Sequence, residues 1–399
     1  MNELPVPDLK QSLQMLADLK SRGRNTNLRP CPVDRPLVLY GAGNLGQLAA
    51  DLFARLDIDV VYAVDRQPPS DPINGRIPIV EPDSAPLADR RDFMIAVCIV
   101  TAPYEPVRDF LESMGWRHIY PVYDLLQAYA DRLPMRNGWF AGVLTDDDWR
   151  NIECVLRGWR DDCSRAAYLQ FLAWRLVRAE WRFSGAPVSI GDRYFIEPVT
   201  SLLTDHECFL DAGAWHGVVS QRFVDETGGS FSRIAAVEAD PRNAERLCEW
   251  KSKLPETLAK RIDILQTALA EKNAGQPFAE GFDMASRLQS GAPHIVRTYT
   301  LDELDIPVTF AKFHLEGGEL NALEGGARTL QRYRPIIAVT VYHNSDGLWR
   351  IPLWFWHCLP EYRLLFRMHG WCGTGAVLYA LPNERVGGKP PTVYPAKAS

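Results

Sequence analysis

The sequence has no long apolar run, no closely paired cysteines and no excess of basic residues. Its longest apolar stretch, Phe93–Val100, is far shorter than the roughly 20 residues that a membrane-spanning helix needs. The first residues carry acids and lack the apolar core of a secretory signal. We therefore expect a cytoplasmic protein without a membrane span.

The eight cysteines are scattered and form no CxxC pair, which disfavours a structural zinc site and a redox dithiol. Most lie in apolar stretches, as Cys98 does, so we expect them to be buried and reduced. The formal net charge of -6 argues against a nucleic-acid-binding protein, because such proteins concentrate lysine and arginine. The oligomeric state is not determined by the sequence, and a homo-oligomer stays open.

At 399 residues, with 46% hydrophobic and 24% charged residues, the chain is expected to form more than one globular domain. Apolar runs that alternate with helical periodicity predict a small Rossmann-like α/β domain over 1–125, with strands over 37–40, 60–64 and 93–100. Helical periodicity alone predicts a connector over 126–190, with a capping box at its Thr145. A larger α/β domain is expected over 191–385, with strands over 262–265, 310–313 and 336–341 among its elements, followed by a flexible tail over 386–399.

The first α/β domain contains a GxGxxG turn after the strand predicted over 37–40. Gly41, Gly43 and Gly46 would let the backbone approach a pyrophosphate at a helix N-terminus. Asp65 ends the next predicted strand at a spacing suited to a ribose hydroxyl. The motif is weak by itself, so it predicts either a nucleotide or nucleotide-sugar site or a structural module without a ligand.

The second α/β domain has a different glycine turn, in which Gly213 and Gly217 are spaced GxxxG and Asp211 precedes them at a strand end. A carboxylate there would repel a pyrophosphate but suit the ammonium and sulfonium charges of S-adenosylmethionine. Glu238 ends the following strand, where it could bind ribose hydroxyls, and Asp240 could lie near the adenine. The alternative is that Asp211 only caps a helix.

At these residues the sequence resembles the FkbM family of methyltransferases. The likeness runs in order through Tyr194-Phe195, Asp205–Ala214, Val237–Asn243, Ala268-Leu269, Thr300–Leu304, Lys312–Glu319, Val341–Asn344, Ile351–Leu353, Met368-His369 and Ala376–Ala380. In the Lys312–Glu319 segment, His314 stands where the family usually has an acid.

The resemblance implies a class I methyltransferase Rossmann-like fold in the C-terminal half, S-adenosylmethionine as cofactor, and O-methylation. The implied acceptors are sugars in glycans or related natural products, and family members often carry an N-terminal GAGxxG domain. The expected cofactor-binding residues are Asp211, Ala212, Gly213, Gly217, Glu238, Ala239, Asp240 and Ala268.

Methyl transfer to a hydroxyl needs an in-line arrangement and removal of a proton. His343 is our first candidate for the base, because it follows the strand predicted over 336–341. The other candidates for the base are Glu316, His314 and His369, and Lys312 could orient the substrate. Three of these residues have a structural alternative: His343 could be a hydrogen-bonded histidine in a loop, Glu316 could stabilise a helix N-terminus, and Lys312 could pair with a nearby acid. The histidines and Glu316 could also bind a divalent metal, but they are far apart in the sequence, so no metal is predicted.

Two further interpretations stay open. The Gly41 to Asp65 region could serve an NAD-dependent oxidoreductase, although no YxxxK pair or comparable hydride-transfer site follows it. It could instead bind a nucleotide-sugar or a partner and bring the acceptor to the methyltransferase. The aromatic residues Trp349, Trp354, Phe355, Trp356 and Trp371 are expected to be packing residues, with Trp349 left open as a wall for a sugar ring.

Overall fold

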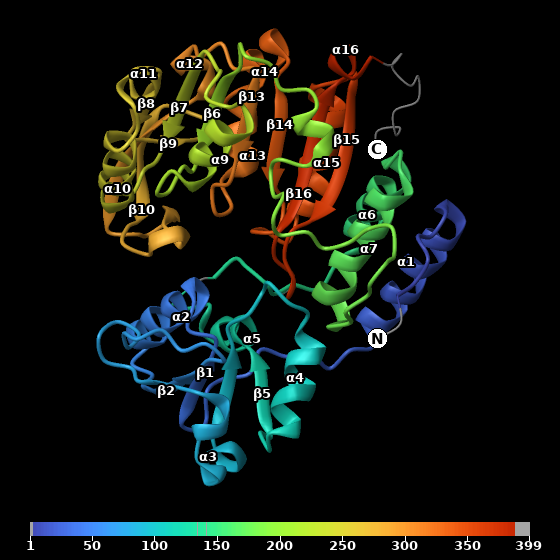
Figure 1. Cartoon of the computed structure of the whole chain (residues 1–399). Helices are drawn as coiled ribbons and strands as arrows, with labels where there is room; N and C mark the ends of the chain where they lie inside the picture. Colours follow the sequence, from blue (N-terminus) through green and yellow to red (C-terminus); the bar gives the residue numbers. More distant parts are fainter. Residues whose placement is uncertain (1–2, 134, 141, 388–399) are drawn as a thin grey trace.

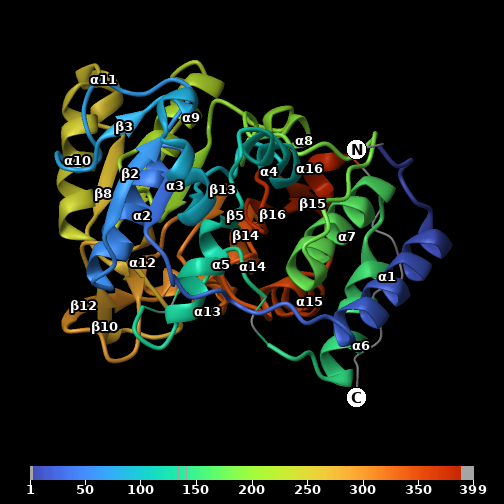
Figure 2. The ribbon, with the colours of Figure 1, turned by 90° about the horizontal axis from the view of Figure 1, so that it is seen from below.

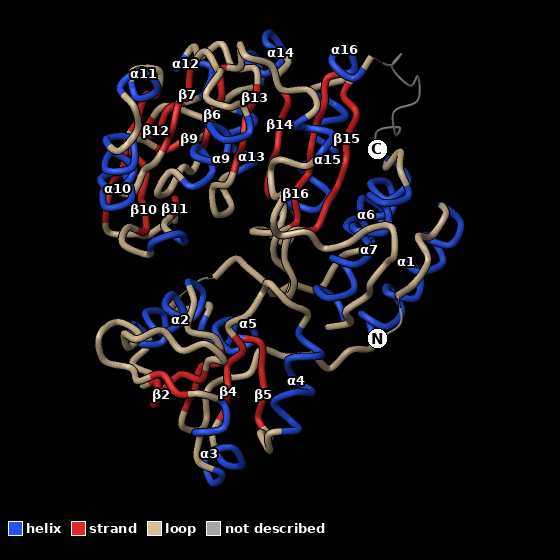
Figure 3. Tube along the Cα trace, viewed as in Figure 1, coloured by secondary structure: helices blue, strands red, loops and turns tan. Residues whose placement is uncertain are grey.

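The computed structural model describes residues 3–133, 135–140 and 142–387, so the predicted tail beyond residue 387 lies outside the described residues. Two α/β parts and a group of helices make up the molecule (Figure 1, Figure 3). Within the described ranges, no helix combines the length and apolarity of a membrane crossing.

The N-terminal α/β part is a five-stranded parallel sheet in the order β3-β2-β1-β4-β5. Its strands are β1 (Leu37–Tyr40), β2 (Val60–Val64), β3 (Ile79–Val80), β4 (Met94–Val97) and β5 (His118–Pro121). Its helices are α2 (Asn44–Arg55), α3 (Leu87–Asp92), α4 (Tyr104–Ser113) and α5 (Val122–Leu126). The predicted strands at 37–40 and 60–64 are confirmed. The strand predicted over 93–100 ends at Val97, because its partner β1 ends opposite that residue.

The helices α6 (Asp146–Gly158) and α7 (Asp162–Val177) form the predicted connector, together with a helix that we had assigned elsewhere. Helix α1 (Leu9–Arg24) falls in the predicted N-terminal domain, but it packs against α6 and α7 (Figure 2). Its Leu16 and Leu19 share a core with Ile152. The capping box is confirmed, since the Asp148 amide donates to Thr145 Oγ1 and the Thr145 amide donates to the Asp148 carboxylate.

The C-terminal part contains a seven-stranded sheet in the order β15-β16-β14-β13-β6-β7-β8, in which only β16 runs against the other strands. Its strands are β6 (Cys208–Ala212), β7 (Arg233–Val237), β8 (Ile262–Leu265), β13 (Phe310–Phe313), β14 (Ile336–Thr340), β15 (Tyr362–Met368) and β16 (Ala376–Pro382). Its helices are α8 (Glu197–Thr200), α9 (Val218–Glu226), α10 (Pro241–Ser252), α11 (Glu256–Ala259), α12 (Leu301–Leu304), α13 (Glu319–Glu324), α14 (Ala327–Tyr333), α15 (Gly347–Cys358) and α16 (Asn383–Val386).

A four-stranded sheet that we did not predict lies beside this domain. It has the order β11-β10-β12-β9, with β9 (Ala268–Leu269), β10 (Ala274–Ala279), β11 (Arg287–Leu288) and β12 (His294–Tyr299). In the larger sheet, β6 lies between β7 and β13. Strand β7 is the next strand in the chain, whereas β13 comes about a hundred residues after β6. The strand order therefore reverses beside β6, and open α/β sheets bind ligands at the carboxyl ends of strands at such a point.

The aromatic residues of α15 are packing residues. Trp349 is 5% exposed and lies against Phe140, so its interpretation as a sugar-stacking wall is wrong. Trp356 packs against Trp159. Trp354 and Trp356 are partly buried and pack against the same core.

The connector is tied to the N-terminal part by buried polar contacts. Arg178, which follows α7, makes a bidentate pair with Asp124 of α5, at 2.8 and 3.1 Å. Both side chains are about nine-tenths buried. Two residues further on, the Glu180 carboxylate accepts from the amides of Tyr104 and Glu105 at the start of α4. These contacts hold the two parts in one arrangement.

Replacing Arg178 with Met should lower the free energy of unfolding by about 3 to 5 kcal/mol, because Asp124 would be left buried without its partner. Arg178→Met combined with Asp124→Asn should recover most of that loss. Urea unfolding followed by tryptophan fluorescence measures both variants. Arg24→Met is the control, since its exposed pair with Asp146 should contribute less than about 1 kcal/mol. Equal losses for Arg178→Met and Arg24→Met would contradict the role of the buried pair.

Candidate active site

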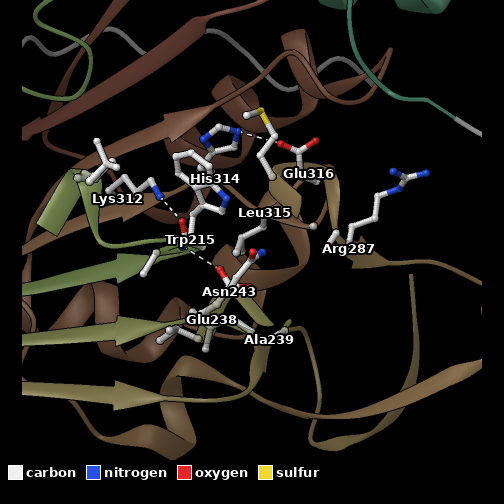
Figure 4. Close-up of a pocket in the computed structure, with 18 of the residues that line it drawn as sticks. Trp215, Glu238, Ala239, Asn243, Arg287, Lys312, His314, Leu315 and Glu316 are labelled. Atoms are coloured by element: carbon white, nitrogen blue, oxygen red, sulfur yellow. Dashed lines mark hydrogen bonds and ion pairs between the residues drawn. The ribbon is translucent and has the colours of Figure 1, made fainter. Parts of the chain in front are cut away.

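A cavity of about 400 Å³ lies at the carboxyl ends of β6, β7 and β13. Seven of the predicted site residues line it: Gly213, Glu238, Ala239, Ala268, Lys312, His314 and Glu316. Figure 4 shows Glu238 and Ala239 on one side of the cavity and His314 and Glu316 on the opposite side. The cavity therefore has two chemically different ends.

The glycine turn after β6 is shaped by a close approach between two backbone segments. Gly213 has φ +79°, and a Cβ built on it would lie 2.0 Å from the carbonyl oxygen of His314. The His314 amide in turn donates to the carbonyl of Ala212. Gly217, with φ +83°, begins α9 against the ring of Trp250 and does not line the cavity. Only glycine fits at position 213 without moving the end of β13.

Asp211 does not face the cavity, so our prediction that it meets a cationic ligand is wrong. Its carboxylate is fully buried, 3.0 Å from Lys312 Nζ, and it accepts a hydrogen bond from Ser220 Oγ at 2.7 Å. Lys312 also donates to the carbonyl of Gly213 at 2.6 Å. The alternative in which Lys312 pairs with a nearby acid is confirmed. Ala212, the next residue on β6, is also buried away from the cavity.

Glu238 is placed at the edge of the cavity by two backbone hydrogen bonds. Its carboxylate accepts from the amides of Trp215 and Asp240, at 2.8 and 2.9 Å. Burial raises its pKa above the ordinary value, although these two amides pull it down. The carboxylate thus joins the glycine turn to the end of β7 and borders the space where a ligand would lie.

Asp240 does not line the cavity, contrary to our prediction, and it has a structural role. One carboxylate oxygen caps α10 by accepting from the Arg242 amide. The other accepts from the Gly281 amide and from Ser286 Oγ, in the segment between β10 and β11. Asp240 therefore holds the small sheet against the cavity.

The opposite end of the cavity contains a network of two histidines and two glutamates. His314 Nε2 lies 3.0 Å from Oε1 of Glu316, and His343 Nε2 lies 3.2 Å from the same oxygen. His343 Nδ1 lies 2.6 Å from Oε1 of Glu319. His343 is fully buried and does not line the cavity, so our first candidate for the base reaches a ligand only through Glu316.

Burial and mutual charge shift the pKa values in this network. Burial lowers the pKa of His314 to about 3, against the opposing effect of Glu316. Burial by itself would raise the pKa of Glu316, but His343 and His314 outweigh it and hold the value well below the ordinary one. Burial would lower the pKa of His343, yet Glu316 and Glu319 raise it well above its usual range.

His369 is not part of the site. Its Nε2 contacts the Tyr379 hydroxyl at 2.8 Å, and its Nδ1 lies 2.5 Å from the carbonyl oxygen of Ser189. Because it follows β15, it lies at the far edge of the sheet from β6. The sequence places it after an apolar strand, but it does not show which strands are neighbours.

Several cavity residues were not predicted. Trp215 lies in the glycine turn with φ +49°, and Asn243 lies in the first turn of α10. The small sheet and the loop within it supply apolar walls from Phe278, Met284 and Leu288. A tryptophan inside a glycine turn is a local signal that could have been used, whereas the small sheet left no clear pattern in the sequence.

Comparison with known proteins identifies the domain that forms this cavity. Residues 211–364 match the family model described as "Methyltransferase FkbM domain". This stretch is an FkbM methyltransferase domain. The resemblance found in the sequence is thereby confirmed for the C-terminal half, and the class I methyltransferase Rossmann-like fold agrees with the strand order around β6.

The FkbM domain and the rest of the chain are similar to a crystal structure of Methyltransferase FkbM from Methylobacillus flagellatus KT. The identity is 20%, the match covers 92% of this chain and 100% of that chain, and the TM-score is 0.64. A precorrin-6y C5,15-methyltransferase from Geobacter metallireducens GS-15 matches at 16% identity, with 49% and 99% coverage and a TM-score of 0.30.

A SAM dependent methyltransferase from Aquifex aeolicus matches at 13% identity, with 48% and 93% coverage and a TM-score of 0.29. A search of curated proteins finds no match to the chain.

Gly213→Ala should destabilise the FkbM domain far more than Gly291→Ala. Both glycines have φ between +78° and +79°, but only the Cβ at position 213 meets another atom within 4 Å. We expect about 1 to 2 kcal/mol for Gly291→Ala from backbone conformation alone. Gly213→Ala should lose more, because the end of β13 must move. Thermal unfolding measures the difference, and equal shifts would contradict the close approach.

Proposed function

We propose that the FkbM domain binds S-adenosylmethionine in the cavity and methylates a hydroxyl of a sugar, glycan or related natural product. The observation that carries the proposal is the single cavity with a carboxylate at a strand end on one side and an imidazole-carboxylate pair on the other. The first end suits the ribose of the cofactor and the second suits a hydroxyl group. The family match supports a methyltransferase in general.

The residues at the Glu238 end fit the cofactor. The Glu238 carboxylate would accept hydrogen bonds from the ribose hydroxyls, and the side-chain amide of Asn243 lies on the same side of the cavity. The Gly213 turn brings the backbone close without a side chain in the way. When bound, S-adenosylmethionine supplies a methyl group on a positively charged sulfur. With Asp211 paired to Lys312, Glu238 is the acid at the ends of β6 and β7 that would face the cofactor.

The residues at the other end would position the acceptor. Glu316 is ionised at neutral pH, so its carboxylate can accept a hydrogen bond from an acceptor hydroxyl, and the neutral His314 ring lies 3.0 Å from it. Their low pKa values make both of them weak bases, because a general base works best when its pKa lies near the working pH. Orientation of the hydroxyl toward the methyl group would therefore contribute more to the rate than proton removal.

The N-terminal glycine turn stays a prediction as a nucleotide or nucleotide-sugar site. Its Asp65 carboxylate accepts from the amide of Ala42 at 2.8 Å, in the way that Glu238 accepts from Trp215. The family match covers residues 211–364, so the NAD-dependent oxidoreductase that was considered for Gly41 to Asp65 also stays a prediction. A role in presenting the acceptor is compatible with the contact between Arg136 and Asn344, which lies beside the Glu316 loop.

Glu238→Gln should weaken the binding of S-adenosylhomocysteine at least about tenfold, because it removes charge-assisted hydrogen bonds to ribose hydroxyls. Isothermal titration calorimetry with the purified protein measures this. Asp65→Asn is the matched control, since it changes the corresponding acid of the N-terminal turn. No measurable heat with the native protein, or an equal loss in the Asp65→Asn variant, would contradict the assignment of the cofactor end.

The native enzyme should methylate hydroxyl groups when it is incubated with S-adenosylmethionine and a panel of sugars, nucleotide-sugars and hydroxylated aromatic compounds. Deuterated methyl donor and mass spectrometry identify the product. Methyl ethers resist mild alkali and distinguish the reaction from ester formation. Products methylated only on nitrogen or carbon would contradict O-methylation.

A further inference from the structure

Two imidazole nitrogens and one carboxylate oxygen converge at the acceptor end of the cavity. The Nε2 atoms of His314 and His343 lie 3.0 and 3.2 Å from the same Oε1 atom of Glu316. All three atoms lie within 4.8 Å of one another. We propose that His314, Glu316 and His343 bind one divalent transition-metal ion.

The spacing of these atoms suits a metal ion. Bonds of about 2.1 Å from a metal to nitrogen or oxygen place neighbouring ligand atoms about 3.0 Å apart at right angles. A set with two imidazoles favours Zn²⁺, Mn²⁺, Fe²⁺ or Co²⁺, whereas Mg²⁺ and Ca²⁺ prefer oxygen ligands. Three protein ligands leave coordination positions open for water or a substrate oxygen, as in catalytic metal sites.

The second nitrogen of each ring is held by another residue. His314 Nδ1 lies 2.8 Å from the hydroxyl of Tyr194, and His343 Nδ1 lies 2.6 Å from the Glu319 carboxylate. Metal-binding histidines use such contacts to fix the ring orientation and the protonated nitrogen. Here they direct both Nε2 atoms toward Glu316.

His343 Nε2 gives independent support. This atom is buried and has no hydrogen-bond partner among the described residues, although it lies 3.2 Å from Glu316. The approach is therefore close but not aligned as a hydrogen bond. A buried polar nitrogen without a partner is costly, and a metal ion between it and the carboxylate would satisfy it.

The loop that carries Glu316 is held in an unusual conformation. Glu316 has φ +49°, a left-handed conformation that costs a non-glycine residue about 1 to 2 kcal/mol. The Glu319 carboxylate accepts from the amides of Leu315 and Gly317, and the Asn344 side chain donates to the Gly317 carbonyl. These contacts fix the loop so that the Glu316 carboxylate points at both histidines.

Charge also favours a cation at this point. Glu316 and Glu319 bring two buried carboxylates to the network, and the buried Lys312 ammonium group is paired with Asp211. The Arg287 guanidinium also attracts Glu316. A divalent ion would balance both carboxylates. If the acceptor is a hydroxyl compound, as in the proposed function, the ion would bind its oxygen and lower the pKa of that hydroxyl, which makes the proton easier to remove.

The test uses tag-free protein that has been treated with a chelator and then titrated with Co²⁺. We expect one equivalent to give a saturable visible absorption spectrum, which Zn²⁺ displaces and Mg²⁺ does not. Glu316→Gln and His314→Asn should each weaken Co²⁺ binding at least about tenfold. His294→Ala, which changes an exposed histidine near Glu280, should leave it unchanged.

Absence of a saturable Co²⁺ spectrum in the native protein would overturn the proposal, whatever the variants do. Unchanged Co²⁺ affinity in Glu316→Gln and His314→Asn would also overturn it. Glu316→Gln keeps the shape of the side chain, and calorimetry with S-adenosylhomocysteine shows that each variant retains its fold. If the protein binds S-adenosylhomocysteine but not Co²⁺, only the metal site is rejected. If it binds Co²⁺ but not S-adenosylhomocysteine, only the cofactor assignment is rejected.

Discussion

The buried ion pair between Lys312 and Asp211 is the interaction on which the cavity depends. The two residues are direct partners on β13 and β6, the strands beside which the strand order reverses. Burying such a pair costs desolvation energy, and the additional hydrogen bonds to Gly213 and Ser220 offset part of it. The pair holds the glycine turn above the end of β13. Because Asp211 is paired and turned away from the cavity, Glu238 is the acid at the ends of β6 and β7 that borders it.

The same strand end also organises the opposite side of the cavity. Lys312 is inside β13, while His314 and Glu316 follow it after the strand has ended, so one short segment connects the ion pair to the acceptor end. Glu319, at the start of α13, binds the backbone of this segment and also His343, which comes from the end of β14. A carboxylate that performs both tasks couples the position of the Glu316 loop to the orientation of the histidine ring. Movement of either strand would change the geometry of the whole network.

Much of this arrangement could be predicted from the sequence, and the remainder depends on strand register. Buried parallel strands appear as apolar runs, which is why the strands at Ile262–Leu265 and Phe310–Phe313 were predicted with their observed bounds. Glu238 and His314 were found because they follow such runs. The direction of the Asp211 side chain could not be predicted, because its partner Lys312 is about a hundred residues away and register is a tertiary property. The small sheet was missed because β9 and β11 are two residues long and β10 contains a glycine and a proline.

His314 reduces the negative charge of this network compared with an acid at the same position. An acid there, as the family usually has, would put a further carboxylate beside Glu316 and Glu319 and increase their repulsion. A neutral imidazole removes that negative charge but keeps a lone pair directed at the same point, and the Tyr194 hydroxyl fixes its orientation. At the metal site proposed above, an imidazole in this position would favour cations that accept nitrogen ligands over those that prefer oxygen. The departure from the family pattern would then alter the selectivity of the site and keep its capacity to bind.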